Sequence, residues 1–173
     1  MSFESALNTS QSLLNAIETG NYDEKQAQGA ITELVQTVEG ARGFFVVLLS
    51  GDFQTKIHLE PTVIEALKSS PEIVAQLLTK NLAMGTAMEV LHGRNGDEEN
   101  LVGSQQVQKR VLELIAELKL APINEQLEEL KNTLENGHGS YQNFLTRFAY
   151  DAFQKEAILK AVDSSTKAGR IKE

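Results

Sequence analysis

Two copies of a Glu-x-x-His motif are the feature of this sequence that comes nearest to a set of metal ligands. They are Glu89 with His92, and Glu135 with His138. Residues three apart lie on one face of a helix, so a carboxylate and an imidazole at this spacing can reach the same metal ion. If both motifs lie on helices that pack together, they predict a metal site between those helices.

The metal in such a site would be iron or manganese, held as in di-iron carboxylate bundles. There, two helices each supply a Glu-x-x-His motif and two further helices supply one glutamate each. The single glutamates would come from Glu39, Glu65 or Glu113. However, Gly93 follows His92, and Gly137 lies inside the second motif, so both motifs are expected at helix C-termini. A histidine there interacts with terminal carbonyls and the helix dipole, and we predict this structural role, with the metal site as the alternative.

The sequence contains no motif typical of nucleophilic catalysis, phosphate binding or calcium binding. The absence of cysteine excludes disulfides, thiolate nucleophiles and cysteine-ligated metal clusters. There is no Gly-x-Ser-x-Gly nucleophile elbow and no phosphate-binding Walker loop. The polar run 92–100 lacks the spacing of a calcium loop and is expected to be a solvated turn. We therefore assign no catalytic residue and no cofactor. We expect a binding protein and not an enzyme.

Aromatic residues gather near the C-terminus. If residues 140–162 form one helix, Tyr141, Phe144 and Phe148 share a face that packs inward. Tyr150 and Phe153 then lie about 100° to 200° away around the axis, at about 100° per residue. Aromatic side chains dominate contacts between proteins. We predict that these two form an interaction surface for a second copy or another protein, most simply in a homodimer; the alternatives are a buried helix and a ligand groove.

The helices that position these residues are predicted to surround the segment 31–49. Apolar residues recur there at helical spacing, and residues 44–49 are apolar without interruption, which is typical of a buried helix. We predict one central helix over about residues 24–50. The run FFVVLL, bounded by Gly43 and Gly51, also satisfies the pattern of a short strand, which is the alternative.

Turn and capping signals divide the remaining chain into further helices. Gly20 ends a first amphipathic helix, and Pro71 and Pro122 each begin another. Short connections favour antiparallel packing of consecutive helices. We predict an all-α, single-domain bundle of six to eight helices over residues 1–162, followed by a flexible tail over residues 163–173, where the apolar pattern ends.

Charge and composition narrow the choice of partners. The formal net charge is −8 and no basic stripe is present, which argues against nucleic-acid binding. The apolar run is far shorter than the about 20 residues that cross a membrane, and no secretory signal is visible. We predict a cytoplasmic, non-catalytic protein that acts by binding other proteins, as an adaptor, assembly factor or regulator. The alternative is a helical protein that binds a metal or a small ligand.

Overall fold

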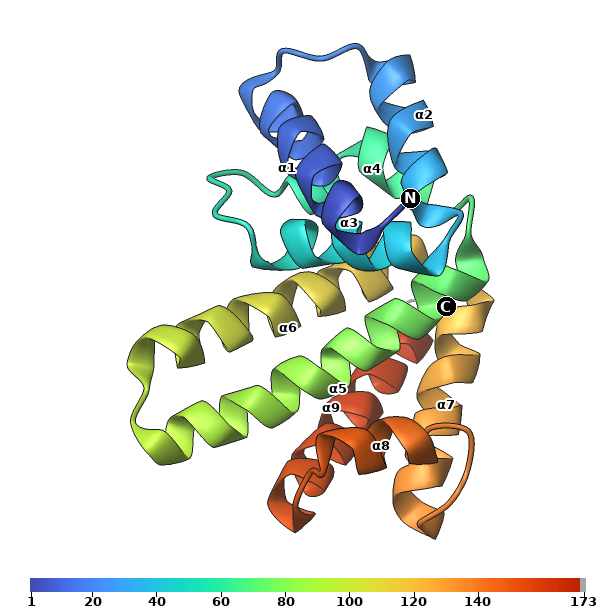
Figure 1. Ribbon diagram of the computed structural model, residues 1–173. Coiled ribbons are helices and arrows are strands. Elements are labelled where there is room, and N and C mark those ends of the chain that lie inside the picture. The colour runs from blue at the N-terminus through green and yellow to red at the C-terminus, as the bar shows by residue number, and fades with distance from the viewer. Residues whose placement is uncertain (172–173) are drawn as a thin grey trace. The chain divides into compact units, whose positions relative to one another are not determined.

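Every regular element of the computed structural model is helical (Figure 1). The structure describes residues 1–171, with side chains to residue 166, and contains no strand in that range. The all-α prediction is confirmed, and the strand alternative for residues 44–49 is wrong. The described residues form nine α-helices, slightly more than predicted, and one 3₁₀ helix. The helices are α1 (Phe3–Thr19), α2 (Glu24–Val35), α3 (Val38–Ser50), η1 (Ile57–Leu59), α4 (Pro61–Leu67), α5 (Pro71–Asn95), α6 (Glu98–Leu118), α7 (Ala121–Asn136), α8 (Gln142–Phe148) and α9 (Ala152–Ile171).

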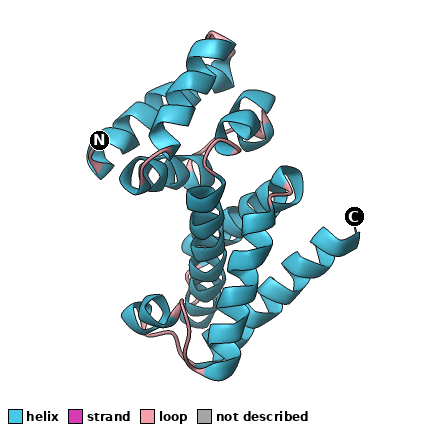
Figure 2. Ribbon diagram, turned by 90° about the vertical axis from the view of Figure 1, so that its right-hand side faces the viewer, coloured by secondary structure: helices cyan, strands magenta, loops and turns pink. Residues whose placement is uncertain are grey.

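The chain divides into two compact units, Met1–Leu77 and Leu78–Glu173. The first contains α1 to α4 and the beginning of α5, and the second contains the rest of α5 and α6 to α9. Short loops join the helices in each unit (Figure 2). No helix among the described residues is both long enough and apolar enough to cross a membrane. The organisation as a single domain stays a prediction.

Helix α3 supplies the core of the first unit, where it packs on α1 and α2. Phe44, Phe45 and Leu48 are completely or almost completely buried. The predicted burial of residues 44–49 is therefore confirmed except at Val46, which is 45% exposed. The predicted continuous helix over residues 24–50 is wrong, because α2 ends at Val35 and α3 begins at Val38.

The interruption before α3 has a local cause. Thr37 adopts an extended backbone conformation, and its side-chain oxygen accepts a hydrogen bond of 3.1 Å from the N–H of Gly40. This bond is an N-cap, which satisfies one of the free donors at the start of a helix. A side chain at Gly40 would overlap the carbonyl oxygen of Leu34, so the tight reversal requires a glycine there.

A single carboxylate holds the irregular segment that follows α3. Glu18 on α1 accepts hydrogen bonds from the backbone N–H groups of Gln54 (2.7 Å) and Thr55 (3.0 Å). The next residues, Ile57 and His58, lie in η1 and are buried. The segment between α3 and η1 is thus attached to the core of the first unit.

In the second unit, α9 packs on α6 and α7, and Gln108 joins α6 to α5. The Gln108 amide donates to the carboxylate of Glu89 (2.5 Å) and the carbonyl of Gly85 (3.2 Å), and its oxygen accepts from the Thr86 hydroxyl (3.2 Å). A buried or half-buried amide of this kind needs partners for both its donor and its acceptor. Gln108 therefore fixes the register of these two long helices.

The last predicted helix is two helices. Helix α8 ends at Phe148, Ala149 adopts a left-handed conformation with φ of 51°, and α9 starts at Ala152. Helix α9 then continues to Ile171, through most of the predicted tail, and Ser165 is buried in it. Residues 172–173 of that predicted tail lie outside the described residues.

Candidate functional site

The Glu-x-x-His motifs do not assemble into a metal centre. The Glu89 carboxylate is bound by the amides of Gln105 and Gln108, and the His92 ring lies 3.8 Å from the Asp97 carboxylate. His138 lies on an exposed turn beyond the end of α7. In the part of the chain that the structure describes, no group of three or more carboxylates and imidazoles is placed to hold a metal. These residues do not fit a di-iron site, and we derive no chemistry from it.

Four aromatic rings form a continuous cluster around α8, which we call the aromatic cluster: Tyr141, Phe144, Phe148 and Tyr150. The Phe144 ring has its neighbours at centroid distances of 6.2 Å (Tyr141), 5.1 Å (Phe148) and 6.2 Å (Tyr150). Phe148 and Tyr150 stack, with an interplanar angle of 11° and centroids 5.8 Å apart. Such contacts between rings stabilise beyond the area that they bury.

The predicted exposure of Tyr150 is wrong. Its side chain is only 8% exposed. The helix that was expected to carry it outward ends at Phe148, and the left-handed conformation of Ala149 folds the chain back, so that Tyr150 stacks on Phe148. The residue belongs to the core of the second unit and not to an outer face.

Phe153 and Phe148 are the exposed aromatic side chains of this region. Phe153 is 72% exposed, as predicted, and Phe148, which was expected to face inward, is 44% exposed. The guanidinium of Arg94 lies 5.6 Å from the centroid of the Phe153 ring, and that of Arg147 lies 5.7 Å from the Phe148 ring. We call these two ring–guanidinium pairs together the aromatic–arginine surface.

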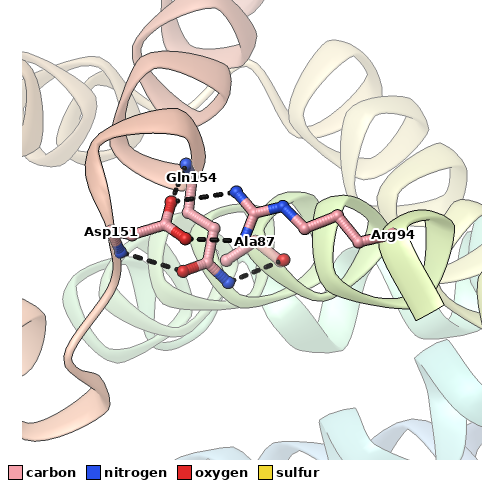
Figure 3. Close-up of polar contacts among 4 residues, drawn as sticks. All are labelled: Ala87, Arg94, Asp151 and Gln154. Atoms are coloured by element: carbon pink, nitrogen blue, oxygen red, sulfur yellow. Dashed lines mark hydrogen bonds and ion pairs between the residues drawn. The ribbon is translucent and has the colours of Figure 1, made fainter.

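An ion pair and a helix cap hold Asp151 and Gln154, which flank Ala152 and Phe153 in the chain (Figure 3). Arg94 donates to both carboxylate oxygens of Asp151, at 2.6 and 3.2 Å. Asp151 also accepts a hydrogen bond from the N–H of Gln154, while the Gln154 amide oxygen accepts from the N–H of Asp151 (both 2.9 Å). The Gln154 amide group finally donates to the carbonyl of Ala87 on α5. The start of α9 is therefore fixed to α5.

This cap was readable in the sequence and was missed. An acid or hydroxyl residue followed three positions later by Glu or Gln is the capping-box pattern of a helix N-terminus. Asp151 and Gln154 satisfy it, and they would have placed a helix start at residue 152. The partnership with Arg94, 57 residues earlier, is non-local and has no such signal.

We expect the Arg94–Asp151 pair to make stability depend on pH in acid. Hydrogen bonds from Arg94, and then from the Gln154 backbone, lower the pKa of Asp151 to about 2. An unfolded aspartate has a pKa of about 3.9. The carboxylate therefore stabilises the fold above about pH 4, and this contribution is lost as the pH falls towards 2.

Urea unfolding of the wild type and of Asp151→Asn between pH 7 and pH 2 measures this contribution. At neutral pH the free energy of unfolding of the wild type should exceed that of the variant by a small amount, because both partners are largely exposed. This difference in free energy should decrease below pH 4 and disappear near pH 2. The stability difference between the wild type and Arg94→Gln should decrease over the same pH range. A stability difference that does not depend on pH in either variant would contradict the stabilising role of the Arg94–Asp151 pair.

A pocket of about 430 Å³ lies between the end of α7, α8 and the start of α9. Leu134 and Leu145 contribute apolar surface, and Thr146, Tyr150 and Lys155 contribute polar groups. Thr146 and Lys155 were not predicted from the sequence. The lining residues come from three different helices, so no single helical repeat relates them. A concave site of this size is within the range of small-molecule pockets.

These features define an all-helical protein whose candidate sites are suited to binding. The chain belongs to the family described as Uncharacterised conserved protein UCP020893, whose model matches residues 2–165. The match covers most of both compact units and includes the residues of the aromatic–arginine surface and of the pocket. No curated protein and no solved structure matches the chain.

Proposed function

We propose that the protein is a cytoplasmic, non-catalytic interaction protein, an adaptor, assembly factor or regulator, that binds through the aromatic–arginine surface. The observation that carries this proposal is the 72% exposure of Phe153, a large apolar side chain beside the guanidinium of Arg94. Aromatic and arginine side chains are the residues that most often dominate binding free energy at protein interfaces. Phe153 is the natural centre of such a contact.

The surroundings of this surface favour binding because they are ordered before a partner arrives. Phe148 stacks on Tyr150, and the Asp151 cap fixes the first turn of α9, which carries Phe153. Side chains that are already restrained lose less conformational entropy when they bind. The surface therefore offers apolar area at a low entropic cost.

A second copy of the chain is the partner that we propose. The surface contains both guanidinium groups and exposed aromatic rings, and these are complementary to each other through cation–π contacts. In a two-fold symmetric dimer the same patch meets itself, so a patch with both chemistries can satisfy both sides. Arg147 makes no ion pair with any described residue, so its charge is available to a partner.

We expect a double variant, Arg147→Ser with Phe153→Ser, to be a monomer at concentrations where the wild type is a dimer. Loss of central interface residues typically costs 2 kcal/mol or more, which is a weakening of roughly 30-fold or more. Sedimentation at micromolar concentration measures the change. Both side chains are exposed, so melting of the double variant followed by circular dichroism should remain close to that of the wild type.

Val102→Ser is the matched control. Val102 is 61% exposed on α6 in the same unit but is outside the proposed surface, so its variant should remain a dimer. A wild type that stays monomeric at these concentrations would contradict self-association. A dimer that survives the double substitution would place the interface elsewhere.

A further inference from the structure

The pocket between α7, α8 and α9 has the composition of a site for an amphipathic anion. Leu134, Leu145 and Ala149 give it apolar surface, Thr133, Gln142 and Thr146 give it neutral polar surface, and Lys155 brings a positive charge. None of the described residues that line it is acidic. Apolar surface beside a single cation and several neutral polar groups suits a ligand that has an apolar body and one negative charge.

Tyr150 brings a hydroxyl to this wall from a side chain that is otherwise buried. The side chain is 8% exposed, and its ring is held between Phe144 and Phe148. Its hydroxyl makes no hydrogen bond with any described residue. The hydroxyl oxygen is not itself enclosed, so it is open to a ligand that accepts its hydrogen bond. Burial also raises the pKa of Tyr150 to about 12, so the hydroxyl remains a donor at neutral pH.

Lys155 lies on the first turns of α9 and lines the same pocket. Its ammonium makes no ion pair with any residue in the described part of the chain. By contrast, Lys160 on the same helix lies 3.5 Å from the carboxylate of Glu156. Lys155 is therefore a cation whose charge is open to an external anion.

We propose that this pocket binds a small monocarboxylate with an apolar body. The carboxylate accepts a hydrogen bond from the Tyr150 hydroxyl and pairs with the Lys155 ammonium, and the apolar body lies against Leu134 and Leu145. A phosphate monoester is a poorer match, because the lining has one cation for a ligand that carries about two charges at neutral pH. No residue belongs both to this pocket and to the proposed dimer surface, although Tyr150 stacks on Phe148 of that surface, and neither proposal depends on the other.

The test is calorimetric titration of the whole protein with octanoate, and with octanamide as its neutral analogue. We expect saturable 1:1 binding of octanoate and an affinity for octanamide at least about tenfold lower, because hydrogen bonds and ion pairs to a charged group are the stronger kind. Tyr150→Phe, which retains the ring, and Lys155→Gln should each weaken octanoate binding by about tenfold. Lys160→Gln removes the same charge elsewhere on α9 and should bind like the wild type.

Each other outcome overturns the proposal. Octanoate that does not bind at millimolar concentration, or that binds without a fixed stoichiometry, shows that this is not a carboxylate site. Equal binding of octanamide contradicts recognition of the charge. Wild-type affinity in both Tyr150→Phe and Lys155→Gln, with unchanged melting temperatures, places any bound octanoate elsewhere. Sedimentation of Lys155→Gln separates the two proposals, because its oligomeric state should equal that of the wild type.

Discussion

Phe45→Ala is expected to lower the free energy of unfolding by about 3–5 kcal/mol, the usual cost of removing a buried phenylalanine ring. Phe45 is 1% exposed at the centre of α3, with its ring edge-on to Phe44 at 6.1 Å. The substitution leaves a cavity that the close-packed surroundings fill only in part. Since small proteins are stable by about 5–15 kcal/mol in total, the loss is a large fraction of stability. Urea unfolding followed by circular dichroism measures it.

Val46→Ala is the control for this experiment, because it changes the next residue of the same helix. Val46 is 45% exposed, so its truncation should cost less than about 1 kcal/mol. The two variants differ mainly in which face of α3 they affect. Equal losses, or a loss below 1 kcal/mol for Phe45→Ala, would contradict the burial of this face.

The burial of most of α3 was predictable, because an uninterrupted run of apolar residues indicates a helix that other helices surround. Its separation from α2 was not, because apolar periodicity is nearly unchanged when a short turn interrupts two helices that bury the same side. The break depends on the hydrogen bond that Thr37 makes to Gly40. A threonine inside an apolar pattern is compatible both with a helix interior and with an N-cap.

The error in the C-terminal region had a larger consequence for the site. Ala149 takes a conformation that alanine seldom adopts, and no glycine or proline marks the turn. A single helix was therefore predicted, and it placed Tyr150 outside and Phe148 inside. The exposure of Phe153 was predicted correctly, although its support by Arg94 comes from a distant part of the chain.

The pocket illustrates what a sequence pattern leaves open. Its walls come from three helices, and neither Lys155 nor Thr146 has a spacing that distinguishes it from an ordinary surface residue. Conversely, the Glu-x-x-His motifs had a distinctive spacing, but α7 ends between Glu135 and His138, and Glu89 on α5 is bound by Gln105 and Gln108. Spacing predicts a site only when the elements that carry the residues are placed correctly.

Gly43→Ala should destabilise the first unit by about 1–3 kcal/mol, the range for overpacking a close contact. A Cβ at Gly43 would lie 2.5 Å from the Cβ of Ala6 on α1, and 3.0 Å from backbone atoms of Ala6 and Leu7. Backbone atoms do not rotate away, so α1 and α3 would have to separate. Helix propensity acts in the opposite direction, because alanine favours a helix over glycine by roughly 0.5–1 kcal/mol.

The sign of the change in the free energy of unfolding therefore distinguishes overpacking from helix propensity. Gly29→Ala is the control for helix propensity alone. A Cβ at Gly29, on α2, has no neighbouring atom within 4 Å, so alanine there should stabilise by about 0.5–1 kcal/mol. Urea midpoints should move in opposite directions for the two variants. Adding Ala6→Gly to Gly43→Ala removes the nearest clash and should recover part of the loss. If Gly43→Ala stabilises the protein as Gly29→Ala does, this result would contradict the close contact of α3 with α1 at Gly43.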